Sequence, residues 1–162
     1  MSKRVELAVG LVVALGLALA FWWANAPRGA NPPLQAEIPD VTVADGAVAL
    51  GDVQLRVGVA TRPIVAFQPV RWRVRAEVGG KPVGLEGARV DFSMSMPMGE
   101  HRHALTLATD GWHQADAVLP ACASGHRRWF ADVTATAQGR PLAARFQFDL
   151  APDPFSAPRE GP

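Results

Sequence analysis

Residues 71–77 read Arg-Trp-Arg-Val-Arg-Ala-Glu, so apolar and charged side chains alternate along this stretch. Trp72, Val74 and Ala76 fall on one face, and the charged residues fall on the other. This period of two is typical of a β-strand with one face buried and the other in water. The glycine pair at 79–80 follows directly and marks a turn.

The same alternation of short apolar-rich runs and turn residues continues over residues 41–150. The chain holds 15 Gly and 14 Pro, which favours many short strands over long helices. The expected strands are 47–50, 53–60, 69–78, 87–96, 101–108, 112–119, 128–137 and 141–149. Strands of this length and spacing predict an all-β fold, an immunoglobulin-like antiparallel β-sandwich of about seven to nine strands.

Composition excludes several classes of protein. The chain has 162 residues, a length typical of one domain, and its apolar share of 49% is enough for a packed core. Sixteen Lys and Arg against fifteen Asp and Glu leave a net charge of +1, too small for a protein that binds nucleic acid through many phosphates. Cys122 is the single cysteine, so an intramolecular disulfide is impossible.

The N-terminal residues 1–26 predict a membrane anchor. An uncharged apolar run extends from Leu7 to Ala24 and ends in two tryptophans, which favour the headgroup layer. Lys3 and Arg4 precede the run, so we expect a single-pass protein of the inner (cytoplasmic) membrane with a cytoplasmic N-terminus and a periplasmic domain. The alternative is a cleaved signal peptide, although the run is longer than a usual signal core.

Two proline-rich segments flank the predicted sandwich. Residues 27–40 contain Pro27, Pro32, Pro33 and Pro39, which predicts a stiff linker leading away from the membrane. Residues 151–162 contain four prolines and little to bury, which predicts a disordered tail.

A cluster of side chains with metal-binding chemistry lies near the middle of the chain. Every methionine except the initiator falls in one short stretch, two histidines follow it, and a cysteine and a histidine come one hairpin later. The candidate metal ligands are Met94, Met96, Met98, His101, His103, Cys122 and His126. Thioether, thiolate and imidazole are soft or borderline ligands, so the set predicts copper, in particular Cu(I).

Strand pairing predicts that these ligands converge. A four-residue turn over 97–100 would place Met96 opposite His101 and Met94 opposite His103 on one face. A turn at 109–111 in the next hairpin would then bring the loop over 120–125 to the same end of the sandwich. We therefore expect the loop that carries Cys122 and His126 to face Met96 and Met98, and His113 to lie at the other end.

Each candidate ligand also has a structural explanation. Met94 and Met96 share a face with Val90 and Phe92, so both are also compatible with a role as core filler. The two histidines near Arg102 are compatible with an exposed strand end, and a single cysteine is often a small buried hydrophobe. An unpaired thiol is a liability in an oxidising compartment, however, which favours a role for Cys122.

Other chemistry finds little support in the sequence. A nucleophile pair of Cys122 and His126 lacks an orienting third group that the sequence identifies, so we expect a binding protein rather than an enzyme. The arginines at 71, 73 and 75 predict a solvated sheet face, with a contact surface for an acidic partner as the alternative.

The order of motifs resembles a known family. Residues 87–98 read Gly-Ala-x-Val-x-Phe-x-Met-x-Met-Pro-Met; an Asp-Gly-Trp turn, a Leu-Pro-x-Cys-x-Ser-Gly loop and Trp129 follow. This order is similar to that of the YtkA-like and FixH-like membrane-anchored periplasmic β-sandwich domains. The resemblance implies copper handling, or assembly of a respiratory haem–copper cytochrome oxidase. It implies ligand positions at Met94, Met96, Met98 and Cys122.

These observations predict a membrane-tethered periplasmic copper-binding protein. It would be a metallochaperone or an assembly factor that exchanges the ion with a protein partner in oxidase assembly or copper homeostasis. The alternative is a non-metal protein-interaction module, in which the sandwich edge or the arginine face docks another membrane protein and the methionines only pack.

Overall fold

A computed structural model describes residues 37–96 and 99–152 of the chain. In these two ranges no helix is long and apolar enough to cross a membrane. The predicted anchor at 1–26 lies outside the described residues, as do the linker up to residue 36 and the tail from residue 153.

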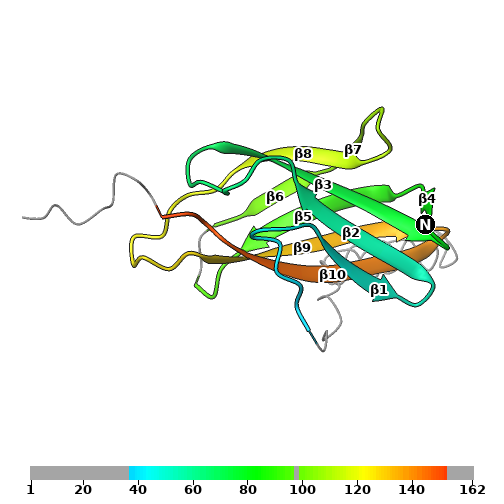
Figure 1. Cartoon of the computed structure of the whole chain (residues 1–162), viewed down its shortest axis with the longest axis horizontal. Coiled ribbons are helices and arrows are strands. Elements are labelled where there is room, and N and C mark those ends of the chain that lie inside the picture. Colours follow the sequence, from blue (N-terminus) through cyan, green and yellow to red (C-terminus); the bar gives the residue numbers. More distant parts are fainter. Residues whose placement is uncertain (1–36, 97–98, 153–162) are drawn as a thin grey trace, which may run out of the picture. The chain divides into compact units, whose positions relative to one another are not determined.

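The described residues form an all-β fold of antiparallel strands joined by turns and loops (Figure 1). The strands are β1 (Gly46–Leu50), β2 (Val53–Val59), β3 (Pro69–Val78), β4 (Lys81–Val83), β5 (Glu86–Ser93), β6 (His101–Ala104), β7 (Thr106–Leu107), β8 (His113–Val118), β9 (Arg128–Ala137) and β10 (Arg140–Asp149). Their positions confirm the expected strands to within a few residues at each end.

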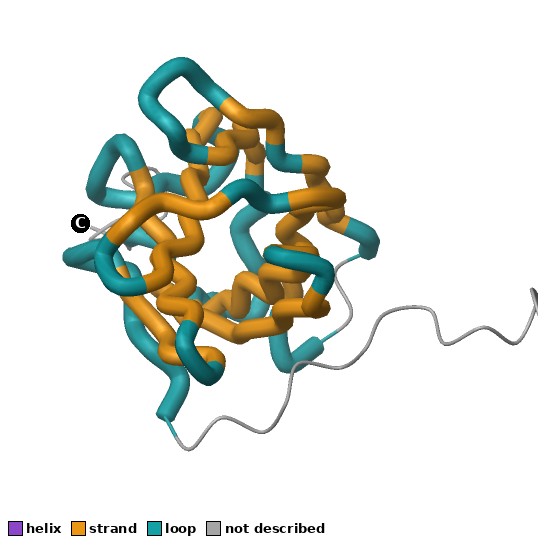
Figure 2. Tube along the Cα trace, turned by 90° about the vertical axis from the view of Figure 1, so that its right-hand side faces the viewer, coloured by secondary structure: helices purple, strands orange, loops and turns teal. Residues whose placement is uncertain are grey.

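Two sheets make up the sandwich. One has the order β1-β2-β3-β8-β7, with β4 pairing to β3, and the other has the order β10-β9-β5-β6. Seen from the end of the molecule, the strands surround the space that the core side chains fill (Figure 2). The fold is therefore a β-sandwich, as the spacing of turns predicts.

Large aromatic side chains join the two sheets. Trp72 of β3 is fully buried, and its ring centroid lies 4.9 Å from that of Phe92 on β5 and 4.7 Å from that of Phe148 on β10. Along β3 the apolar members of the opening stretch are buried and the arginines point outward. The alternation in the sequence thus identifies the face that builds the core.

The count of strands differs from the expected seven to nine, because the structure describes ten. The expected strand 101–108 divides at Leu105, which is buried and donates its N–H to the Ala88 carbonyl at 2.8 Å. Residues before Leu105 pair in one sheet as β6, and those after it pair in the other as β7. The short β4 adds the further strand.

The hairpin between β7 and β8 confirms the predicted turn at 109–111. Thr106 pairs with Gln114, and Leu107 pairs with His113. His113 therefore begins β8 at the end of the sandwich opposite to the loop after Val118. Its imidazole is buried, with Nε2 3.1 Å from the Leu85 carbonyl. The exclusion of His113 from the candidate site fits this position.

Candidate functional site

The residues that follow β5 and the loop from 119 to 127, which joins β8 to β9, lie at the same end of the sandwich (Figure 1). We call this end the tip and define it by residues 94–96 and 119–127. The first segment follows β5 in one sheet, and the second follows β8 in the other sheet. The tip therefore brings together residues that are far apart in the sequence.

Two of the predicted ligands touch at the tip. The Cys122 Sγ lies 3.2 Å from the Met96 Sδ, and both side chains are half-buried. When the thiol is protonated, it donates its hydrogen to the thioether sulfur, which is a weak acceptor. The contact creates a pair of adjacent soft donors from two segments of the chain, and soft donors are the ligands that Cu(I) prefers.

Ser124 connects this pair to His126. Its hydroxyl oxygen lies 2.9 Å from the Cys122 Sγ, 2.8 Å from Nδ1 of His126 and 3.9 Å from the Met96 Sδ. A turn makes this possible, because the Gly125 N–H donates to the Cys122 carbonyl at 3.0 Å and Gly125 has a φ of 79°. That left-handed conformation is one that glycine adopts without strain.

The hydroxyl of Ser124 has one hydrogen, which it can donate either to Cys122 or to His126 but not to both. Hydrogen bonds from the Ser124 hydroxyl and backbone lower the pKa of Cys122, and the His126 backbone acts in the same direction against the opposing effect of burial. When the thiolate forms, Ser124 donates to it and accepts from Nδ1–H of His126. Neutral His126 then keeps its lone pair on Nε2, where a metal ion is able to bind it.

Sequence reasoning did not identify Ser124 as a site residue. The signal was present in the Cys-Ala-Ser-Gly-His loop at 122–126, where a short hydroxyl side chain precedes a glycine turn. The three polar side chains of this loop alternate with Ala123 and Gly125. The turn at Gly125 folds them toward one another.

Met94 and the two other histidines occupy different surroundings. Met94 is buried with the core residues, in keeping with the core-filler interpretation. His101 is half-buried and meets the Trp129 ring edge to face, with centroids 5.6 Å apart. His103 is half-buried against Phe92, with centroids 5.8 Å apart.

The predicted pairing of the Met and His residues is wrong. His101 pairs with Phe92, and His103 pairs with Val90, instead of with Met96 and Met94. Strand β5 ends at Ser93, so the connection to β6 is longer than the four-residue turn expected at 97–100. The observed register differs from the predicted register by an even number of residues. Both histidines therefore still point toward the core side of their sheet.

An ion pair accompanies the observed register. It places Arg102 opposite Asp91, and two guanidinium nitrogens of Arg102 donate to one carboxylate oxygen of Asp91 at 3.1 and 2.9 Å. The expected register would have placed Arg102 opposite the neutral Ser95. A directly opposed pair of unlike charges favours the observed alignment.

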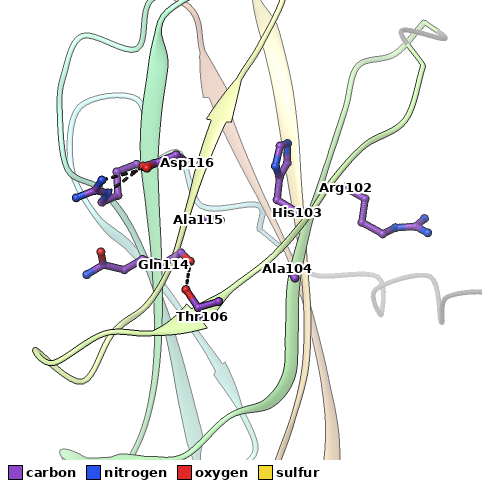
Figure 3. Close-up of a pocket in the computed structure, with 8 residues that line it drawn as sticks. Arg102, His103, Ala104, Thr106, Gln114, Ala115 and Asp116 are labelled. Atoms are coloured by element: carbon purple, nitrogen blue, oxygen red, sulfur yellow. Dashed lines mark hydrogen bonds and ion pairs between the residues drawn. The ribbon is translucent and has the colours of Figure 1, made fainter.

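His103 lines a polar cleft between β6 and β8, away from the tip (Figure 3). The cleft has a volume of about 480 Å³. Figure 3 shows Arg102 extending from the other side of β6, as alternation along a strand requires. The lining residues are Arg71, Arg102, His103, Ala104, Thr106, Gln114, Ala115 and Asp116.

The remaining predicted ligand, Met98, lies outside the described residues. Within the described ranges, no three or more His, Cys, Asp or Glu side chains form a group that would hold a metal ion. The described part of the candidate site therefore depends on sulfur from Met96 as well as on Cys122 and His126, rather than on a cage of imidazoles and carboxylates.

Each arginine of the stripe has a carboxylate partner. Arg71 donates to both carboxylate oxygens of Asp116 at 2.9 and 3.0 Å. Arg73 donates one hydrogen bond to Asp45, which also pairs with Arg62, and Glu77 pairs with both Arg75 and Arg56. The ion pairs are Arg71–Asp116, Arg73–Asp45 and Arg75–Glu77. Two of these three carboxylates are shared with a further arginine, Asp45 with Arg62 and Glu77 with Arg56, so the face keeps part of its positive charge.

Comparisons with known proteins give little information. No protein-family model matches the chain, and no curated protein matches it. Among solved structures, the crystal structure of an engineered protein is similar, with 22% sequence identity and a TM-score of 0.41. The match covers 59% of this chain and 20% of the engineered chain.

Proposed function

We propose that this chain is a membrane-tethered periplasmic protein whose immunoglobulin-like sandwich binds Cu(I) at its tip and exchanges it with a protein partner. The ligands in this proposal are Cys122, Met96 and His126, with Met98 as a further sulfur donor. The role is that of a metallochaperone or an assembly factor for a haem–copper oxidase, or of a carrier in copper homeostasis.

The observation that carries the proposal is the 3.2 Å contact between the Cys122 and Met96 sulfurs. Both side chains pack against the hydrophobic core, and this packing holds the two soft donors next to each other at a half-exposed tip. The lowered pKa of Cys122 favours the thiolate, which is the form that binds metal. A rim position suits exchange, since an incoming ligand can reach the ion.

The resemblance to YtkA-like and FixH-like domains supports the same proposal independently of the geometry. It covers about residues 45–150 together with the anchor at 1–26, which together describe an exported, single-pass protein. A fusion of alkaline phosphatase to the C-terminus tests this topology, because the enzyme is active only after export. An inactive fusion would place the domain in the cytoplasm and overturn the periplasmic assignment.

The binding test is a competition titration of Cu(I) between the detergent-solubilised full chain and a chromogenic Cu(I) chelator under anaerobic conditions. We expect the wild type to withdraw Cu(I) from the chelator. The Cys122→Ser and Met96→Leu double variant should leave the ion with the chelator, because both soft donors are lost.

Met94→Leu is the matched control, since it removes a methionine of the same stretch whose side chain is buried in the core. Leucine nearly conserves the volume of methionine, so the fold should remain intact. The control should retain the affinity of the wild type. Equal Cu(I) binding by the double variant and the wild type would contradict the proposal.

A further inference from the structure

Arginine side chains gather on the outer face of one sheet. Strands β2, β3 and β8 lie side by side in this sheet (Figure 1), and alternation along each strand turns one set of side chains away from the core. Four arginines of β2 and β3 belong to this outer set, and a fifth joins them through its ion pair with Asp45. We call the five guanidiniums the arginine face: Arg56, Arg62, Arg71, Arg73 and Arg75.

The arginine face carries more positive than negative charge. Among the described residues, three carboxylates pair with its five guanidiniums, namely those of Asp45, Glu77 and Asp116. The described residues as a whole contain as many lysines and arginines as aspartates and glutamates. The fold therefore concentrates an excess of two positive charges on one side of a domain that is otherwise balanced.

Two arginines share one carboxylate at the first of two clusters on this face. Arg56 and Arg75 are directly opposed on β2 and β3, and both pair with Glu77. The Glu77 side chain is 10% exposed, whereas the Arg56 side chain is 45% exposed, so water meets mainly the positive groups. Like charges at opposed positions repel each other, and a further anion would therefore stabilise the cluster.

A second cluster with the same composition lies beside the first. Asp45 pairs with Arg62 and Arg73, each at 2.9 Å. Gly58 makes room for this carboxylate, because a Cβ at that position would lie 2.6 Å from an Asp45 oxygen. Arg73 and Arg75 are two residues apart on β3, which places the two clusters about 7 Å apart along the strand.

Trp112 orients one guanidinium from each cluster. The guanidinium carbon of Arg73 lies 4.9 Å from the centroid of the Trp112 ring, and that of Arg75 lies 4.7 Å from it. Stacking on an aromatic ring restricts the side chains before any ligand binds, so less conformational freedom is lost on binding. Guanidiniums held in this way suit carboxylates, which accept two hydrogen bonds in a fixed geometry.

We infer that the arginine face docks an acidic segment of a partner protein, extended and with carboxylates at alternate positions. Alternate side chains of an extended segment lie on one side at a spacing of about 7 Å, which matches the spacing of the two clusters. A membrane surface presents its headgroups without such a repeat. The inference goes beyond the proposed copper function, because none of these arginines lies at the tip.

Fluorescence anisotropy with the full chain in an uncharged detergent tests the inference. The probe is a fluorescein-labelled peptide of alternating glutamate and threonine. The comparison peptide has the same number of glutamates, placed at every third position, so that they alternate between the two sides of an extended chain. We expect the first peptide to bind more tightly, and its binding to weaken as the salt concentration rises.

Arg56→Gln is the diagnostic variant, because Glu77 keeps Arg75 as its partner and the core is unchanged. We expect the affinity for the alternating peptide to fall about two- to fivefold. Ala47→Glu should also weaken binding, since Ala47 is exposed opposite Arg56 and the new carboxylate would compete for that guanidinium. Arg89→Gln is the matched control, because it removes the same charge from an exposed position on β5 in the other sheet.

Several results would overturn the inference. These are no peptide binding by the wild type, equal binding of the two peptides, or an equal loss of affinity in Arg56→Gln and Arg89→Gln, which would show a response to net charge alone. Displacement of the peptide by phosphatidylglycerol in mixed micelles, where phosphatidylcholine has no effect, would identify the face as a membrane-binding surface instead. Cu(I) affinity should be the same in Arg56→Gln and the wild type, so this inference and the proposed function can fail separately.

Discussion

The Ser124 hydroxyl lies 2.8 Å from Nδ1 of His126, and the same oxygen lies 2.9 Å from the Cys122 thiol. Serine therefore stands between a thiol, which can lose its proton, and an imidazole, which in its neutral form keeps one ring nitrogen unprotonated. Ionisation of the thiol and the choice of imidazole tautomer are coupled through one hydroxyl hydrogen. In the copper site proposed above, both groups would reach their metal-binding forms together.

Ser124→Ala should raise the pKa of Cys122, because the hydrogen bond from the serine hydroxyl is the largest cause that lowers it. The rate of alkylation by iodoacetamide follows the thiolate fraction, so its half-maximal point should move to higher pH. Ser93→Ala, at the end of β5, is the control and should leave the profile unchanged. Identical pH profiles for Ser124→Ala and the wild type would remove the serine from this role.

Trp72→Ala should lower the free energy of unfolding by about 3–5 kcal/mol, because it empties a fully buried position that joins the two sheets. Trp112→Ala is the comparison. That ring is half-exposed beneath the guanidiniums of Arg73 and Arg75, contacts worth about 0.5–1 kcal/mol each. Urea denaturation followed by circular dichroism measures both, and equal losses would contradict this account of the core.

Local pattern was sufficient to predict the strands. The ranges 69–78 and 128–137 coincide with β3 and β9, because alternation of buried and exposed side chains is a property of each strand alone. The turn at 109–111 was predicted for the same reason, since its Asp-Gly pair acts locally. The all-β class and the two-layer core follow from these elements.

How separate segments pair and pack against one another was harder to predict from the sequence. The register of β5 and β6 places Asp91 opposite Arg102 and leaves a longer loop than expected, and neither feature follows from the period of two. The change of sheet at Leu105 was missed because the buried Leu105 continues the alternation of residues 101–104, and only the exposed Leu107 departs from it. Ser124 was missed because its role depends on the turn at Gly125, which folds three side chains of one loop together.

Stability at low pH should depend on Asp45. Burial alone would raise the pKa of this carboxyl. The Arg62 and Arg73 guanidiniums, each 2.9 Å from it, lower the pKa by more than burial raises it. The net folded pKa is below that of the unfolded chain, about 3.9. The stabilising contribution is therefore complete above the unfolded pKa and is lost as pH falls through the folded one.

Asp45→Asn removes this carboxyl and its dependence on pH. Near neutral pH the variant should be less stable than the wild type, and the difference should shrink as the buffer is taken below about pH 3.9. Urea midpoints of the full chain at several pH values measure the difference. A gap between the two proteins that stays constant, or grows, on acidification would exclude Asp45 as a source of the acid sensitivity.

The register of β5 and β6 can be tested by cysteine cross-linking in a Cys122→Ser background. Asp91→Cys with Arg102→Cys places two thiols at directly opposed positions, close enough for a disulfide under mild oxidation. Ser95→Cys with Arg102→Cys places them opposite each other only in the alternative, wrongly predicted register. We expect rapid loss of free thiols, measured by mass spectrometry, in the first pair alone. Faster cross-linking of the second pair would mean that Met96 faces His101, and the imidazole would then lie beside the Met96 sulfur at the tip.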